Sequence, residues 1–281
     1  MKRFFEWRIR CGVVAVVLLI VGVVFLPIAP SVKDVVWGGI GLSAGVISAL
    51  WTWWWPRVPA RIPIFLMLHS VSDAVVDPEC ANNTLRPSEL ETLIGNLLVA
   101  GYTFKTVSEA AEKAGRRSVV LSFDDGYVDN YLYLFPILKK YGVKATCYIT
   151  NRGETDSTFL TPAQVREMDA SGLVEFGGHT AHHTKLDLVP FATAKAEIEA
   201  NVAWLTKVLG KAPKTFAYPC GGYTDEVIDV VRSVGYRTAV TMHKKMRAVS
   251  DNPLLIHRQI IPRDKTPWQA YALATRGKYR L

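Results

Sequence analysis

The stretch VVLSFDDGYVDN, residues 119–130, places two neighbouring aspartates, Asp124 and Asp125, directly after an apolar run and directly before a glycine. An apolar run of this length is typical of a buried strand. Burying two adjacent carboxylates is costly unless a cation pairs with them. The stretch therefore predicts a buried strand that ends in a turn whose charges have a task.

Outward from this stretch, short apolar runs alternate with helical patterns from residue 62 onward. Strands are predicted near 62–68, 103–106, 118–123, 144–149, 173–177, 215–218, 236–241 and 254–260. Helices are predicted near 87–101, 108–114, 128–141, 162–171, 191–209, 224–234 and 266–275. Such alternation indicates a parallel sheet, and its repetition indicates a closed or nearly closed barrel. We therefore expect an α/β fold, a deformed (β/α) barrel of about seven strands.

The N-terminal part of the chain differs from the rest because it is almost purely apolar between its ends. Residues 11–29 carry no charge over 19 positions, and residues 35–55 carry none over 21. Each run is long enough to cross a bilayer as a helix. We expect a two-helix transmembrane hairpin in residues 1–56, a linker at 57–63 and a catalytic domain at 64–281. The alternatives are a signal peptide for the first run and an interfacial helix for the second.

The basic residues predict on which side of the membrane the chain ends lie. They flank both runs, at Lys2, Arg3, Arg8, Arg10, Arg57 and Arg61. The positive-inside rule then places both ends, and the large domain, in the cytoplasm of a two-pass cell-membrane protein. The four cysteines form no CxxC motif, which agrees with a reducing compartment. The net charge of +8 fits a neighbouring anionic bilayer, and without a basic stripe interleaved with aromatics we expect no nucleic-acid partner.

Histidines collect at the ends of the predicted strands, where barrel enzymes carry their chemistry. Five of the six follow this pattern: His69, His179, His182, His183 and His257. Histidine and carboxylate together are a normal ligand set for Zn²⁺, and would also accept Co²⁺ or Ni²⁺. An isolated Asp-Asp-Gly is usually only a turn, and an isolated HxxxH is a common surface pattern. Their joint placement after strands is what predicts a catalytic metal site.

Three segments of the sequence, LSFDDG, HTAHH and FAYPCGGYTDEVIDVVRSVGYRTAV, resemble the motifs of the polysaccharide deacetylase family. This family is also called the NodB-homology or carbohydrate esterase family 4 group, and the resemblance covers residues 62–265. It implies a deformed β/α barrel and a metal-dependent N-deacetylase that acts on amino sugars. By this resemblance Asp124 matches the catalytic base, and Asp125, His179 and His183 match the metal ligands. The family spacing leaves His182 as a residue that supports a ligand or is simply solvated.

The general acid and the group that orients the base depart from the usual family pattern. The family acid is a histidine in a late LxxH motif, which LLIHRQI does not match. The early segment FLMLHSV matches better and resembles family members with circularly shifted motifs, so His69 is the expected acid and His257 the alternative. Many members orient the base with an arginine where Tyr218 stands here. We expect Arg258 to take that task.

The resemblance and the residues together predict an order of events at the site. Asp124 takes a proton from a water that attacks the amide carbonyl, and His69 gives a proton to the departing amine. The backbone N–H of Gly221 is expected to stabilise the oxyanion. Residues expected to contact the substrate are Tyr218, Pro219 and Tyr127.

The expected function is a membrane-anchored, divalent-metal-dependent hydrolase. It would remove N-acetyl groups from an amino-sugar glycan or from a lipid-linked amino sugar. One alternative is a deformylase of a lipid-phosphate-linked sugar. Another is a catalytically silent, membrane-tethered carbohydrate-binding module, which the intact set of Asp124 and three metal ligands disfavours. A third treats the hairpin as the functional part and the domain as its scaffold.

Overall fold

A parallel sheet organises the part of the chain that the computed structural model describes: residues 60, 62–75, 78–113, 115–242 and 252–276. Its strands, in spatial order, are β10 (Ile256–His257), β9 (Thr238–Thr241), β8 (Thr215–Ala217), β7 (Val174–Gly178), β6 (Ala145–Ile149), β5 (Ser118–Phe123), β1 (Ile64–Leu68) and β11 (Gln259–Ile260). Every neighbouring pair is parallel. A ninth strand, β4 (Thr103–Phe104), also pairs with β5.

One late segment, residues 256–260, closes this sheet. Its first half, β10, pairs with β9, in register His257↔Thr241. Its second half, β11, pairs with β1 at the opposite edge, in register Leu66↔Gln259. Only Arg258 separates the two halves, so β10 and β11 are one continuous segment. The eight strands of the spatial order therefore correspond to seven positions around a barrel. The expected parallel β/α barrel is confirmed.

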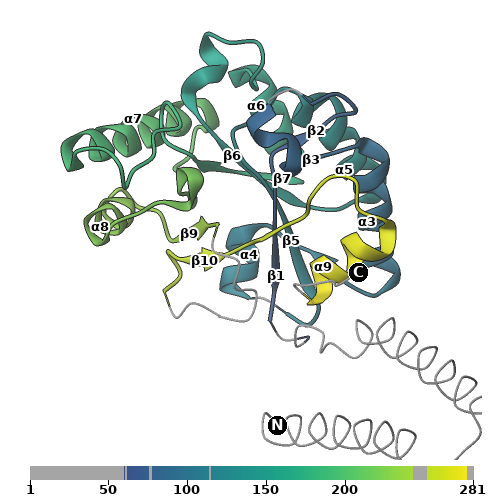
Figure 1. The fold of residues 1–281 in the computed structure, drawn as a ribbon. Coiled ribbons are helices and arrows are strands. Elements are labelled where there is room, and N and C mark those ends of the chain that lie inside the picture. The colour runs from purple at the N-terminus through teal and green to yellow at the C-terminus, as the bar shows by residue number, and fades with distance from the viewer. Residues whose placement is uncertain (1–59, 61, 76–77, 114, 243–251, 277–281) are drawn as a thin grey trace, which may run out of the picture. The chain divides into compact units, whose positions relative to one another are not determined.

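Helices connect the strands, as parallel pairing requires. They are α3 (Pro87–Val99), α4 (Val107–Glu112), α5 (Phe135–Tyr141), α6 (Pro162–Ala170), α7 (Phe191–Leu209), α8 (Asp225–Ser233) and α9 (Pro267–Arg276). Threonine side chains cap the first turns of α4, α6 and α8 by accepting a backbone N–H. Although α3 and α9 come from opposite ends of the described chain, they pack against each other (Figure 1).

Short elements interrupt this regular alternation close to the strand ends. They are the turns η1 (Pro78–Asn83), η3 (Asn151–Glu154) and η4 (Pro219–Gly221), the π-helix η2 (Asn130–Leu134), and the two-stranded parallel pair of β2 (Ser70–Val71) and β3 (Thr84–Leu85). The helix predicted at 128–141 is therefore two elements, a π-helical turn followed by α5. The extra residue per turn of a π-helix often marks a functional site.

The core forms between the sheet and its covering helices. All six residues of β5 are buried, which confirms the predicted buried strand before the two aspartates. Leu66, Leu121 and Cys147 from adjacent strands lie in one apolar cluster with the helix residues Leu93 and Leu97. Burial of apolar surface is the main driving force of folding, so this cluster stabilises the packing of the helices on the sheet.

The expected membrane hairpin, residues 1–56 with spans 11–29 and 35–55, lies outside the described residues. Among the helices that the structure does describe, none combines the length and the apolar character needed to cross a bilayer.

Candidate metal centre

The predicted site residues gather where the parallel strands end. Asp124 and Asp125 follow β5, His69 follows β1, and His179 follows β7. The turn after β5 is tight, because Asp125 and Gly126 both have positive φ angles, 71° and 79°. A Cβ atom at Gly126 would lie 2.6 Å from Cγ2 of Ile149, so only glycine fits there. The sequence DDG thus turns the chain and aims both carboxylates at the end of the barrel.

Asp125, His179 and His183 form a group that fits one divalent metal ion. Oδ1 of Asp125 lies 3.3 Å from Nε2 of His179 and 3.2 Å from Nε2 of His183. One ligand atom from each of the three residues lies within 4.8 Å of the others. Bonds of about 2.0–2.2 Å around a tetrahedral zinc ion put neighbouring ligand atoms about 3.4 Å apart. The donor set and its spacing therefore match a three-ligand site with room for a fourth ligand.

Neighbouring groups fix the orientation of His179. Its Nδ1 lies 2.8 Å from the carbonyl oxygen of Ala217. Because a carbonyl only accepts, Nδ1 carries a hydrogen and Nε2 is the atom left to bind a metal. Its backbone N–H donates to Oδ1 of Asn201 (3.0 Å), and Nδ2 of Asn201 donates to the carbonyl oxygen of Ile149 (3.1 Å). Helix α7 thus fixes the loop that carries the two ligating histidines.

His182 points away from this group. Its Nδ1 lies 2.8 Å from Oε1 of Glu197, and its side chain is 75% exposed. Of the two possibilities left by the sequence, the structure favours the solvated one, and the two histidines that the family spacing selects are the two beside Asp125.

Asp124 has a different partner. Arg258 donates to both of its oxygens, with Nη1–Oδ1 and Nη2–Oδ2 distances of 2.6 Å each. The guanidinium is fully buried, donates also to Oγ of Ser122 at 3.1 Å, and lies over the ring of Tyr148. Burial alone would raise the pKa of Asp124, but the charge and hydrogen bonds of Arg258 outweigh burial and hold that pKa below its usual value. The contact expected from the sequence, with Arg258 beside Asp124, is present.

Burial and charge also separate the protonation states of the ligand group. Burial would raise the pKa of Asp125, but the hydrogen bond and charge of His179 hold it well below its usual value. Burial would lower the pKa of His179, but Asp125 and Asp124 together raise it. Burial, with the charge of His179, lowers the pKa of His183 to about 4. His183 therefore presents a neutral imidazole at pH 7, as a metal ligand must.

The two candidate acids differ in their access to the site. Nε2 of His69 lies 4.0 Å from Oδ2 of Asp125, and the residue is 8% exposed. His257 directly precedes Arg258, whose side chain reaches Asp124. Neighbouring side chains of an extended segment point to opposite faces, so His257 is directed away from the aspartates. The geometry favours His69.

Two expected roles need correction. The N–H of Gly221 donates to the carbonyl oxygen of Tyr218 at 2.8 Å, so the η4 turn already uses it and an oxyanion would have to break that bond. Tyr218 is fully buried and packs edge-on against Phe216 at 5.3 Å, so it is a core residue and not a substrate contact. Pro219 is also buried, and Tyr127 is 5% exposed and stacks on Phe159. A substrate contact by Pro219 or Tyr127 stays a prediction.

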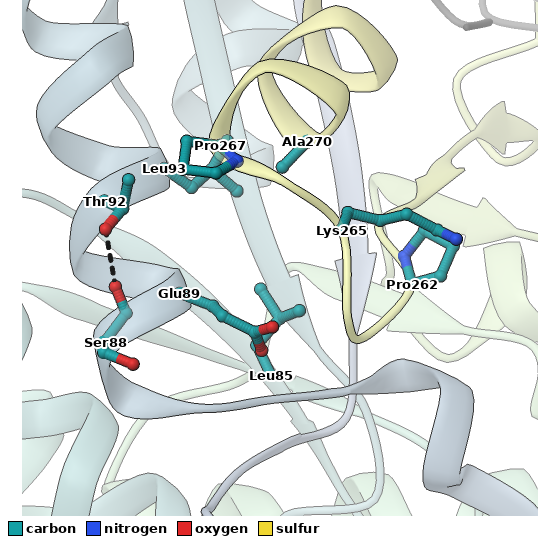
Figure 2. A pocket seen from close by; sticks show the side chains of 9 residues that line it. All are labelled: Leu85, Ser88, Glu89, Thr92, Leu93, Pro262, Lys265, Pro267 and Ala270. Atoms are coloured by element: carbon teal, nitrogen blue, oxygen red, sulfur yellow. Dashed lines mark hydrogen bonds between the residues drawn. The ribbon is translucent and has the colours of Figure 1, made fainter. Parts of the chain in front are cut away.

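A pocket of about 140 Å³ lies elsewhere, between α3 and the chain around α9 (Figure 2). It is lined by Leu85, Ser88, Glu89, Thr92, Leu93, Pro262, Lys265, Pro267 and Ala270. None of these residues belongs to the metal group or to the Asp124–Arg258 pair. The candidate site is therefore defined by converging chemical groups and not by this hollow.

The fold and this group together resemble those of one class of protein, the polysaccharide deacetylases of the NodB type. Residues 111–239 match the family model described as polysaccharide deacetylase. YxkH of Bacillus subtilis (strain 168), by its name a candidate polysaccharide deacetylase, is 29% identical over 208 residues, which cover 71% of each chain.

Two further comparisons agree with this class. A Staphylococcus aureus protein (strain MSSA476) named poly-beta-1,6-N-acetyl-D-glucosamine N-deacetylase is 29% identical over 204 residues, which cover 66% of this chain and 70% of that protein. The solved structure of the Streptococcus pyogenes deacetylase PplD in complex with acetate has a TM-score of 0.67 at 28% identity, and the match covers 75% of this chain and 96% of that one.

Proposed function

We propose that this protein is a divalent-metal-dependent N-deacetylase of an amino-sugar glycan. The observation that carries the proposal is the convergence of Asp125, His179 and His183 beside an aspartate that Arg258 keeps ionised. The similarity to a poly-N-acetylglucosamine N-deacetylase supports a β-linked N-acetylglucosamine polymer as the substrate class.

Asp124 is the general base of this proposal. When bound, the ion supplies Lewis-acid chemistry: it polarises the acyl oxygen and makes water more acidic. Asp124 accepts the proton of the attacking water, because it is the carboxylate beside the ligand group that is not itself a ligand. The two hydrogen bonds from Arg258 hold its plane and keep it unprotonated near neutral pH.

His69 is the general acid. Its Nε2 faces the ligand group, 4.0 Å from Asp125. It donates a proton to the amine nitrogen as the bond between that nitrogen and the acyl carbon breaks. A base that must be ionised and an acid that must be protonated together give a bell-shaped dependence of kcat/KM on pH. Zn²⁺ is the ion that this two-histidine, one-carboxylate set fits, and Co²⁺ or Ni²⁺ fit the same donors.

We propose in addition that residues 1–56 anchor the domain to the cell membrane. The support is the pair of uncharged runs at 11–29 and 35–55 with basic flanks. A domain on the cytoplasmic side would suit a lipid-linked amino sugar, whereas an outward-facing domain would suit a polymer. Labelling of a cysteine introduced at Arg57 with an impermeant reagent, from either side of the membrane, decides between the two.

The test of the activity uses the full chain, purified in detergent, with its metal content measured. Acetate and free amine should appear in equal amounts from an N-acetylglucosamine oligomer, and chelation followed by addition of Zn²⁺ should abolish and then restore the reaction. Protein that holds one ion per chain and releases no amine from N-acetylated, N-formylated or lipid-linked amino sugars would overturn the proposal.

A further inference from the structure

Asp129 is a buried carboxylate that the proposed reaction does not use. It is 4% exposed and accepts hydrogen bonds from the hydroxyl of Ser70, from the N–H of Val71 at 3.2 Å and from Nδ2 of Asn130 at 2.8 Å. Only hydrogen bonds offset its burial, and among the described residues no lysine, arginine or histidine forms an ion pair with it. A buried carboxylate without a cation is costly, so its three contacts call for an explanation.

These contacts hold the chain on both sides of the peptide that carries His69. Asn130 donates to the carbonyl oxygen of His69 at 3.1 Å, through the same Nδ2 that contacts Asp129. The backbone N–H of His69 donates to the carbonyl oxygen of Asn83 at 3.0 Å. Asp129 holds the next two residues, Ser70 and Val71. The segment that bears the acid is thus attached directly to the chain that follows Asp124 and Asp125.

Within the part of the chain that the structure describes, the imidazole of His69 has no hydrogen bond that fixes its direction. Its Nδ1 is buried and has no hydrogen-bond partner among the described residues. In His179, by contrast, Nδ1 is bonded to Ala217. The direction of the His69 ring therefore depends on its backbone and its packing. The backbone is held from η2, whose π-helical turn starts at Asn130.

We propose that Asp129, together with Asn130, is a positioning residue for the general acid. It fixes the segment of residues 69–71 relative to the turn that carries the base and the metal ligand, so that acid and base keep their distance through the reaction. The inference rests on the proposed function, in which His69 protonates the leaving amine.

The test compares Asp129→Ala with Asp129→Asn on two substrates. Asparagine keeps an oxygen for the two N–H donors, and its NH₂ can donate to Ser70, whose hydroxyl also accepts. The first substrate is an N-acetylglucosamine oligomer, whose amine must be protonated as it leaves. The second is 4-nitrophenyl acetate, whose phenolate leaves without a proton. The matched control for lost stability is Thr146→Val. It removes a buried hydroxyl that is hydrogen-bonded to Glu175 and to the N–H of Val107, and it lies near the start of β6, away from the strand ends that carry the site.

A misplaced acid costs up to about 10²-fold, so Asp129→Ala should lower kcat on the amide about 10–100-fold. In Asp129→Ala, the KM, the zinc affinity and the rate on the ester should each differ from the native values by less than about threefold. Asp129→Asn should recover most of the amide rate. The alkaline limb of the pH profile should flatten in Asp129→Ala and stay in Thr146→Val, which gives a second test on the amide alone.

An equal loss on amide and ester, or an unchanged amide rate with an unchanged pH profile, overturns the inference. His69→Gln separates it from the proposed function. If His69→Gln selectively loses the amide reaction and Asp129→Ala does not, only the positioning role falls. If His69→Gln loses nothing selectively, the acid assignment falls and the positioning role falls with it. If the native protein releases no amine from any amino sugar, the proposed function itself fails.

Discussion

Asp124 and Asp125 are neighbours in the sequence and equally hidden, at 2% and 5% exposure, yet their surroundings differ. Asp124 lies against a guanidinium that donates to both of its oxygens. Asp125 lies among imidazoles, of which His183 has a pKa of about 4 and is neutral at pH 7. The chain thus pairs one carboxylate with a permanent charge of its own and surrounds the other with imidazole nitrogens.

This difference is the basis of the two proposed roles, Asp124 as base and Asp125 as ligand. A carboxylate bound by arginine keeps its charge and its orientation, which suits a general base. A carboxylate surrounded by imidazole nitrogens has the donors that a transition metal needs. In the proposed function, the partner of each aspartate, and not its depth, therefore determines whether it acts as base or as ligand.

The largest expected effect is on the ligand side. Asp125→Ala and His179→Ala should lose the metal ion and lower amine release by about 10³-fold or more, because the Lewis-acid contribution is lost whole. Metal content after gel filtration and turnover in the same sample measure both. Retention of zinc by His179→Ala at native affinity would show that the three side chains do not share one ion.

On the base side, Asp124→Asn should lower kcat by about 10²–10⁴-fold, the usual contribution of a general base. Its metal content should stay that of the native protein, because Asp124 is not a ligand. Asp124→Asn and Asp125→Asn make the same substitution one position apart. Asp124→Asn should keep the metal ion, and Asp125→Asn should lose it.

Loss of Arg258 should have a larger effect on the free energy of unfolding than on metal binding. Arg258→Met leaves Asp124 buried without a cation and should lower the free energy of unfolding by about 3–5 kcal/mol at pH 7. The native ion pair stabilises above the ordinary aspartate pKa of about 3.9 and loses this contribution as pH falls through the lower folded pKa. In Arg258→Met burial raises the pKa of Asp124, so the deficit should shrink towards pH 4. Urea unfolding of metal-free protein at pH 4 and pH 7, with Arg258→Lys as the control that keeps the charge, measures this.

The smallest expected effect belongs to His182. Its 75% exposed ring pairs with Glu197, and an ion pair at the surface contributes about 1 kcal/mol or less. His182→Ala should keep its zinc and change turnover less than about twofold, within the effect of such a surface pair. A loss comparable to that of His183→Ala would mean that the structure assigns the wrong histidine to the ion.

Much of this architecture follows from local sequence patterns. The strand before Asp124 and the helix of residues 191–209 are long, periodic and flanked by turn residues, so their positions were predictable. The convergence of Asp125, His179 and His183 was predictable because they follow predicted strands, and a parallel barrel brings all strand ends to one side. The two-residue strands β2 and β3 were not predicted, since they are shorter than any periodic pattern.

The rest depended on contacts that a sequence does not display. The N–H of Gly221 donates to the carbonyl oxygen of Tyr218 within the η4 turn, in which Cys220 has a positive φ of 54°. Asp129 and Asn130 end the stretch of residues 119–130, yet their contacts are with Ser70 and His69, about sixty positions earlier. Their only signal was two polar residues at the start of an apolar helix, which equally fits an ordinary helix start.

The segment that closes the barrel, residues 256–260, also completes the site, because it carries Arg258. Arg258 lies 134 positions after Asp124, in the last strand segment along the chain. A chain that ends before residue 256 lacks this segment, so β1 loses its partner β11 and Asp124 loses the guanidinium that offsets its burial. An unpaired strand edge of this kind is a place where other chains can pair.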